Sequence, residues 1–176
     1  MSRFEHLAFV RISDADKPAF NDICAILPKH IERILDGFYA HVSREPELAK
    51  LIGDPSNIPR LKAAQRQHWA GLFRGDFSEQ FIAQAIRIGE AHERIGLTPR
   101  WYIGAYAYVM AELAPVLTKE YRWQPARLAA AMAAMSKAIA LDMELAISVY
   151  LEKGQERRLS DLRTVASKLS SGIGEA

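Results

Sequence analysis

The amino-acid sequence predicts an all-α fold. Apolar residues recur every three to four positions along most of the chain, which is the spacing of one helix face. Serine, threonine or proline stands where such stretches begin, as is typical of helix starts. β-branched residues nowhere alternate with polar ones over the length of a strand. The 176 residues suit one domain with a short extension, long enough to bury roughly 70% of the unfolded chain's surface.

Prolines and short polar segments divide the first part of the chain into four expected helices. Ser13 is placed to cap the first helix, and Pro28 fits the first turn of the second. Glu45-Pro46 begins a short third helix, and a loop over residues 53–57 precedes the fourth. The expected helices are 13–27, 28–43, 46–53 and 58–73.

Three longer helices are expected in the second part. Ser78 is placed to cap a helix that ends at Gly96, and Thr98-Pro99 has the form of a helix start. Pro115 predicts a kink or an early end in that helix, which otherwise runs to about residue 121. Pro125 begins the last helix, whose alanine-rich first half favours helix strongly.

The composition shifts from apolar to charged after Tyr150, which divides the chain into a domain at 1–155 and an extension at 156–176. Apolar residues of the extension stand near heptad spacing, which predicts the start of a coiled coil. They are Leu159, Leu162, Val165 or Ala166, Leu169 and Ile173.

Charge and composition exclude several partner classes. The formal net charge is only +2, so nothing draws the chain strongly to nucleic acid or to an anionic membrane. No apolar run is long enough to span a bilayer, and the N-terminus lacks the features of a secretory signal. Cys24 is the only cysteine, so no internal disulfide forms and a cytoplasmic location is expected.

Motifs of common enzymes are absent from the sequence. It contains no Gly-rich phosphate loop, no Gly-x-Ser-x-Gly and no Cys-x-x-Cys, and its histidines and glutamates do not have the spacing of zinc or di-iron helices. We therefore expect a domain that is not an enzyme. The absence of Cys-x-x-Cys-His also means that any haem is held non-covalently.

The histidine pattern allows a cofactor with a single protein ligand. No two of the five histidines are three or four residues apart, so a helical bis-histidine site is disfavoured. His92 is the best candidate, because apolar residues share its helix face and Gly89, one turn earlier, would leave room for a flat ring. The alternatives are a core histidine whose hydrogen bonds are satisfied within the protein, or a histidine at the helix C-terminus that the helix dipole favours.

Groups opposite such a ligand must come from other helices. Tyr39 lies in an apolar stretch and could donate a hydrogen bond, or it could be a tyrosine at the edge of the core. Gln65 and His68 either face solvent or line a pocket. Periodicity alone leaves these alternatives open.

Residues 86–106, which contain His92-Glu-Arg-Ile-Gly-Leu-Thr-Pro-Arg-Trp-Tyr102, closely resemble the proximal segment of the globin-coupled sensors. In that family the pattern His-x-x-Ile-Gly-Leu-x-Pro-x-Trp-Tyr follows the proximal histidine. Phe38-Tyr39 with Glu45-Pro46 resembles the distal region, and Tyr39 precedes His92 by 53 residues, as in the family. Residues 142–150 resemble the last helix, so the likeness covers about residues 10–155.

The resemblance implies a globin-like fold with an extended C-terminal helix and non-covalent haem b. It implies that His92 is the proximal iron ligand and that Tyr39 is the distal hydrogen-bond donor. Some members have threonine where Ala64 stands, so a second distal donor would be missing unless Gln65 replaces it. The other expected haem-pocket residues are Phe38, Leu61, Ala64, Gln65, His68, Ile88, Trp101 and Tyr102.

The resemblance also implies a function. It predicts a cytoplasmic gas sensor that binds oxygen, and also carbon monoxide, nitric oxide or cyanide, as a homodimer joined through its last two long helices. Ligand binding would be signalled to a C-terminal output module, with aerotaxis the expected process. The alternatives are a stand-alone protoglobin-like globin that binds or oxidises small ligands, and a haem-free helical interaction module. The charged extension after Tyr150 favours the sensor over the stand-alone globin.

Overall fold

A computed structural model describes the backbone of residues 7–173 and the side chains of residues 7–167. Every regular element in this part of the chain is helical, so the predicted all-α class is confirmed. The elements are η1 (Asp14–Asp16), α2 (Lys17–Val42), α3 (Pro46–Ile52), η2 (Pro55–Asn57), α4 (Ile58–Leu72), α5 (Glu79–Arg94), α6 (Pro99–Glu120) and α7 (Pro125–Ile173).

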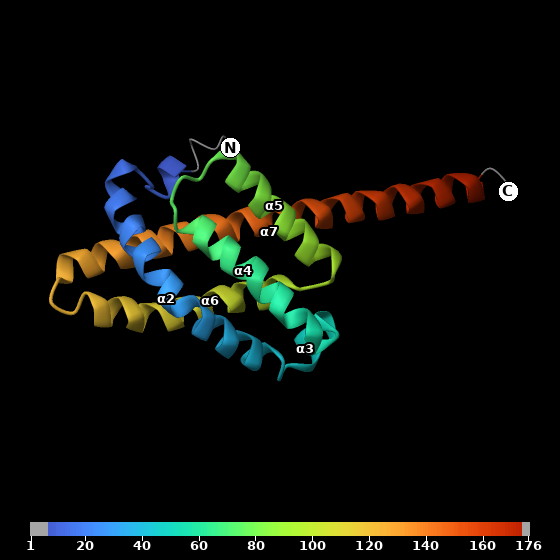
Figure 1. Ribbon diagram of the computed structural model, residues 1–176. Coiled ribbons are helices and arrows are strands. Elements are labelled where there is room, and N and C mark those ends of the chain that lie inside the picture. Colours follow the sequence, from blue (N-terminus) through green and yellow to red (C-terminus); the bar gives the residue numbers. More distant parts are fainter. Residues whose placement is uncertain (1–6, 174–176) are drawn as a thin grey trace.

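The long helix α7 organises the molecule. Its first half packs against α2, α4, α5 and α6, Arg157 still contacts Glu93 of α5, and the last part extends beyond the other helices (Figure 1). Helix α2 also packs against α4 and α6, whereas α4 and α5 have little direct contact with each other. The candidate functional site lies between α4 and α5, beside α6 and α7.

Two apolar clusters fill the interior. The larger one joins α2, as far as Leu35, to α4, α6 and α7, and includes Phe20, Leu72 and Leu113. The smaller one lies between the end of α2, α3 and the start of α6. Leu97, which directly follows α5, packs against both clusters and so connects them.

Helix starts follow the sequence signals at four positions. Pro46, Pro99 and Pro125 are the first residues of their helices, where the missing N–H of proline costs no hydrogen bond. The Ser78 hydroxyl accepts a 3.3 Å hydrogen bond from the Phe81 N–H and so caps α5. These predictions are confirmed.

The prediction of two helices at 13–27 and 28–43 is wrong. Ser13 precedes the short η1 turn, and α2 runs without a break through Pro28 to Val42. Proline removes one helical hydrogen bond and crowds the preceding turn. Burial of Leu27 and Ile31 on either side of it outweighs that local cost. Helix α6 continues through Pro115 to Glu120, so its predicted end near residue 121 is confirmed and the early end at Pro115 is wrong.

Helix α7 changes character near residue 150. Val149 is buried, whereas Leu151, Leu159, Leu162 and Val165 are exposed. The predicted domain boundary at 155/156 falls inside this continuous helix and stays a prediction. The side chains of Leu169 and Ile173, which belong to the expected heptad pattern, lie outside the described residues. Within the described part, none of the helices has the length and apolarity that a membrane span needs.

Candidate functional site

Helix α5 carries His92 and is held close to α7. Ala85 and Gly89 are the buried residues of α5. A Cβ atom added to Gly89 would lie 3.0 Å from the Ala146 Cα atom and 3.2 Å from its carbonyl oxygen. Gly89 therefore serves the close approach of α5 to α7. The expectation that it leaves room for a flat ring beside His92 is wrong.

The His92 imidazole is half-buried and makes no hydrogen bond of normal geometry to any described residue. Its Nδ1 atom is shielded from solvent without a partner, and its ring centre lies 5.1 Å from that of Tyr102. Burial lowers the pKa of His92 below its ordinary value, and the nearby His68 lowers it further. The Ile88 carbonyl one turn earlier acts in the opposite direction. Burial therefore favours the neutral imidazole, which is the form that binds a metal.

A chain of hydrogen bonds extends from Tyr102 across the interior. The Tyr102 and Tyr106 hydroxyls are 2.8 Å apart, and Tyr106 donates to Asp142 Oδ2. His68 Nε2 is 2.7 Å from the same oxygen. Burial raises the pKa of both tyrosines, and the charge of Asp142 raises it further. The chain thus joins α4, α6 and α7 beside His92.

One face of α4 carries the four residues predicted from that helix. Leu61, Ala64, Gln65 and His68 follow the spacing of a single helical stripe. Leu61, Gln65 and His68 are half-buried and Ala64 is exposed. The Gln65 Oε1 atom is buried and has no hydrogen-bond partner among the described residues. An unpaired buried amide oxygen is costly, so this face is suited to a polar guest.

Tyr39 belongs to the smaller apolar cluster, together with Phe38, Leu61 and Trp101. Its hydroxyl makes no hydrogen bond to the described residues, and burial raises its pKa to about 12. Trp101 Nε1 donates a 2.8 Å hydrogen bond to Glu47 and so attaches α6 to α3. The Tyr39 hydroxyl therefore keeps its proton at neutral pH and remains available as a donor.

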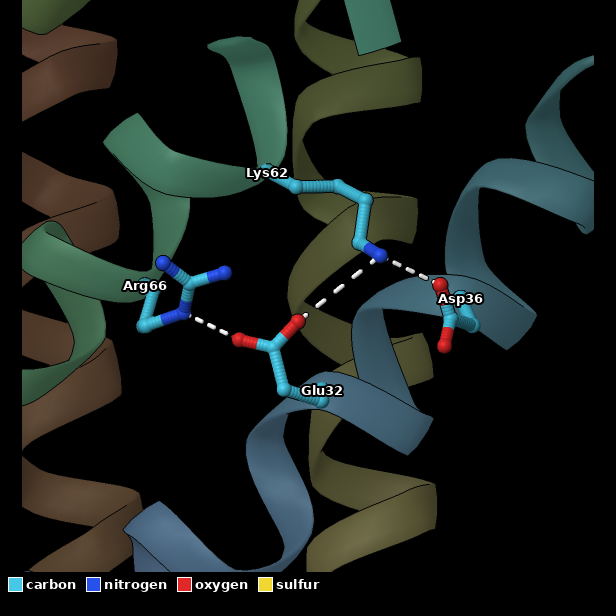
Figure 2. A network of polar contacts seen from close by, with 4 residues as sticks. All are labelled: Glu32, Asp36, Lys62 and Arg66. Atoms are coloured by element: carbon cyan, nitrogen blue, oxygen red, sulfur yellow. Dashed lines mark hydrogen bonds and ion pairs between the residues drawn. The ribbon is translucent and has the colours of Figure 1, made fainter. Parts of the chain in front are cut away.

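An open hollow of about 430 Å³ lies beside Tyr39, between α2 and α4. Four charged residues bridge the two helices at its edge: Lys62 contacts Glu32 and Asp36, and Arg66 contacts Glu32 (Figure 2). Such exposed pairs contribute little each, typically about 0–1 kcal/mol. They connect α2 and α4 beside Tyr39.

The structure brings the predicted residues together in two groups. His92, Tyr102 and His68 share the polar side of the site, and Phe38, Tyr39, Leu61 and Trp101 share the apolar side. Tyr106 and Asp142 were missed as site residues. A signal for Asp142 was present, because it is a single carboxylate within the apolar run from Ala138 to Met143.

Comparison with known families agrees with this geometry. The family model described as protoglobin matches residues 3–156, which is most of the chain. The chain belongs to the protoglobin family. The resemblance to globin sensors inferred from the sequence is thereby confirmed.

Among the curated relatives of this protoglobin chain is the heme-based aerotactic transducer HemAT of Halobacterium salinarum. The two are 26% identical over 160 residues, which is 86% of this chain and 33% of that protein. The chain thus spans about a third of the length of the relative.

Two solved structures share the fold. The globin domain of a Geobacter sulfurreducens globin-coupled sensor matches with a TM-score of 0.79 at 21% identity, over 85% of this chain and 98% of that one. The globin domain of E. coli DosC, in its ferric form, matches with a TM-score of 0.71 at 19% identity, over 82% and 96% of the two chains. The predicted globin-like fold is therefore confirmed.

Proposed function

We propose that this chain is a haem-binding gas-sensor domain with His92 as its iron ligand. The observation that carries the proposal is the His92 imidazole itself. Its Nδ1 atom is shielded without a hydrogen bond of normal geometry, and burial favours the neutral ring, on a helix that has little contact with α4 opposite. The buried, unpaired Gln65 Oε1 on α4 is a second group suited to a polar guest between the two helices.

The residues of the two groups then take distinct roles. Haem supplies an iron that binds diatomic gases reversibly, and His92 holds it from α5. The group is haem b, held without covalent attachment, because the chain has no Cys-x-x-Cys-His. Tyr39 donates a hydrogen bond to the gas. The apolar walls are Phe38, Leu61, Ala64, Ile88 and Trp101.

The gas most compatible with this pocket is oxygen. Bound oxygen is polar and accepts a hydrogen bond, and the Tyr39 hydroxyl is a donor in an apolar cluster. Carbon monoxide, nitric oxide and cyanide are expected to bind as well. The description of the Halobacterium relative as an aerotactic transducer supports a sensory role over an enzymatic one.

Signalling is proposed to pass through a homodimer. The outward faces of α6 and α7 carry small exposed residues, which allow two helices to approach closely. They are Gly104, Ala107 and Ala111 on α6 and Ala129, Ala133 and Ala140 on α7. Because α7 continues past the domain, a shift at this interface would reach an output module in the cytoplasm.

An absorption spectrum of the purified chain tests the proposal. We expect one haem per chain, a ferrous form that binds oxygen reversibly, and a carbon monoxide complex. His92→Ala should lose the haem, or retain it only with added imidazole, whereas His41→Ala, an exposed histidine of α2, should behave as wild type. A colourless wild-type protein, or an unchanged ferrous spectrum in His92→Ala, would refute the assignment.

A stand-alone gas-binding globin is the second candidate, since the protoglobin match ends at residue 156. The two candidates differ in what α7 does after residue 150. Spin labels at exposed positions 159 and 162 should report a ligand-dependent distance change between protomers in a sensor, and none in a stand-alone globin.

A further inference from the structure

Asp142 is the one acidic or basic side chain in the buried interior of the described residues, with 1% of its surface exposed. It lies in the apolar half of α7, next to buried Leu141 and near Ala146. Burying a carboxylate is costly, and replacing a buried ion pair by apolar residues is often neutral or stabilising. Asp142 is therefore not explained by a contribution to stability, and we look instead at which side chains it orients.

The hydrogen bonds at Asp142 determine which group donates and which accepts in each hydrogen bond from Asp142 back to Tyr102. Tyr106 donates to Oδ2, and His68 Nε2 lies 2.7 Å from the same oxygen. Since the single proton of the Tyr106 hydroxyl is used there, the 2.8 Å contact between the two tyrosines requires Tyr102 to donate to Tyr106. The Tyr102 oxygen is then left with only acceptor capacity towards His92 and its surroundings.

We propose that Asp142 is a positioning residue that orients Tyr102 against His92 and anchors His68 to α7. Tyr102 has no proton to offer a guest in this arrangement, so donation falls to Tyr39 or to the Gln65 amide. Because His68 is on α4, Tyr106 on α6 and Asp142 on α7, both α4 and α6 are tied to the helix that leaves the domain. The effect on a cofactor rests on the proposed function, whereas the orientation of the tyrosines does not.

The orientation is tested first in the purified chain, without reference to haem. Tyrosine labelled with ¹³C at Cζ reports the hydrogen bonding of each hydroxyl, and Tyr102→Phe and Tyr106→Phe assign the two resonances. Asp142→Asn should move the resonances of both tyrosines, because an amide accepts more weakly and can itself donate. Asp161→Asn, an exposed acid on the same helix, is the matched control and should move neither.

A second variant guards against a folding failure. Tyr106→Phe leaves the Asp142–His68 contact in place but removes the link to Tyr102. It should shift the Tyr102 resonance in the same way as Asp142→Asn does. If the Tyr102 resonance is unchanged in both variants, or if it changes equally in Asp161→Asn, the proposal is overturned.

The link to His92 is tested in the haem-loaded chain by the iron–histidine stretching frequency in its resonance Raman spectrum. Asp142→Asn should shift this frequency, and the shift should vanish when Tyr102 is already phenylalanine. A shift of the same size in the Tyr102→Phe background would mean a general structural effect and would overturn the positioning role. A chain without haem would refute the proposed function alone, since the tyrosine resonances would still decide the orientation.

Discussion

Gly89→Ala tests how α5, and with it His92, is held in place. Inside a helix, alanine is favoured over glycine by about 1 kcal/mol. At Gly89 the new Cβ would lie 3.0 Å from the Ala146 Cα atom and 3.2 Å from both the Ala146 oxygen and Val149 Cγ2. The optimum for such contacts is about 3.5–4.0 Å, and two of the three atoms belong to the α7 backbone, which cannot rotate away. The two helices must therefore separate.

The loss of stability expected for Gly89→Ala is measured against a matched control variant. Gly71→Ala is also inside a helix, but its Cβ would meet only the end of the Arg74 side chain, at 3.7 Å. Overpacking costs roughly 1–3 kcal/mol, and the helix preference is shared by both variants. We therefore expect Gly89→Ala to be less stable than Gly71→Ala by about 1–3 kcal/mol.

Urea unfolding followed by circular dichroism measures this difference as a shift of midpoint at constant slope. Haem retention should fall in Gly89→Ala as well, because His92 lies one turn further along α5. If the two variants unfold at the same urea concentration, the close packing of α5 on α7 is not what requires glycine at position 89.

Three further predictions concern the pocket, the pH response and the assembly. Tyr39→Phe should raise the oxygen dissociation rate about ten-fold, because it removes a hydrogen bond worth roughly 1–3 kcal/mol. Stopped-flow measurements should show a smaller change in carbon monoxide binding, and equal changes for both gases would indicate altered access to the pocket instead. The pKa of His92 is lower in the folded chain than its ordinary 6.5, so the unfolded chain binds the proton more tightly. Stability before haem is added should therefore fall as pH drops through 6.5, and urea midpoints of His92→Gln should show a smaller decrease than wild type. Sedimentation at tens of micromolar should give a dimer of the 19.7 kDa chain, and Ala133→Arg should shift it towards monomer; a monomeric wild type would exclude the interface.

The sequence predicts most helix limits because local chemistry determines them. Ser78, Pro99 and Pro125 act through their own backbone and nearest neighbours, so their effect can be deduced without tertiary structure. Pro28 could not be judged in this way. Whether a helix continues through proline depends on the apolar residues that the two halves bury together, and those contacts come from other helices.

The site shows the same division. His92 and Tyr102 were predicted from one motif, and Tyr39 from the block that resembles the distal region. The partners of Tyr102 could not be predicted, because Asp142 is 36 residues from Tyr106 and 74 from His68, and only the packing of α4 and α6 on α7 brings them together. Gly89 was misjudged for a related reason: periodicity gives the face of a residue but not which neighbour covers that face.

The position of Asp142 along α7 matters for any signal. The inner face of α7 is buried up to Val149, whereas Leu151 and the later apolar residues are exposed, so Asp142 lies two turns before the helix leaves the domain. A packed interior does not deform gradually, and elements within it shift between discrete arrangements. A change at His92 that moved Tyr102 would act on α7 through Tyr106 and Asp142, at a point where the inner face of α7 is still packed against the other helices. Further along, Arg157 of α7 contacts Glu93, the residue after His92, so the exposed half of α7 has a second link to α5 at the surface. The hydrogen bonds of Asp142 differ in being buried, so they can convert movement of the site into movement of α7 within the packed interior.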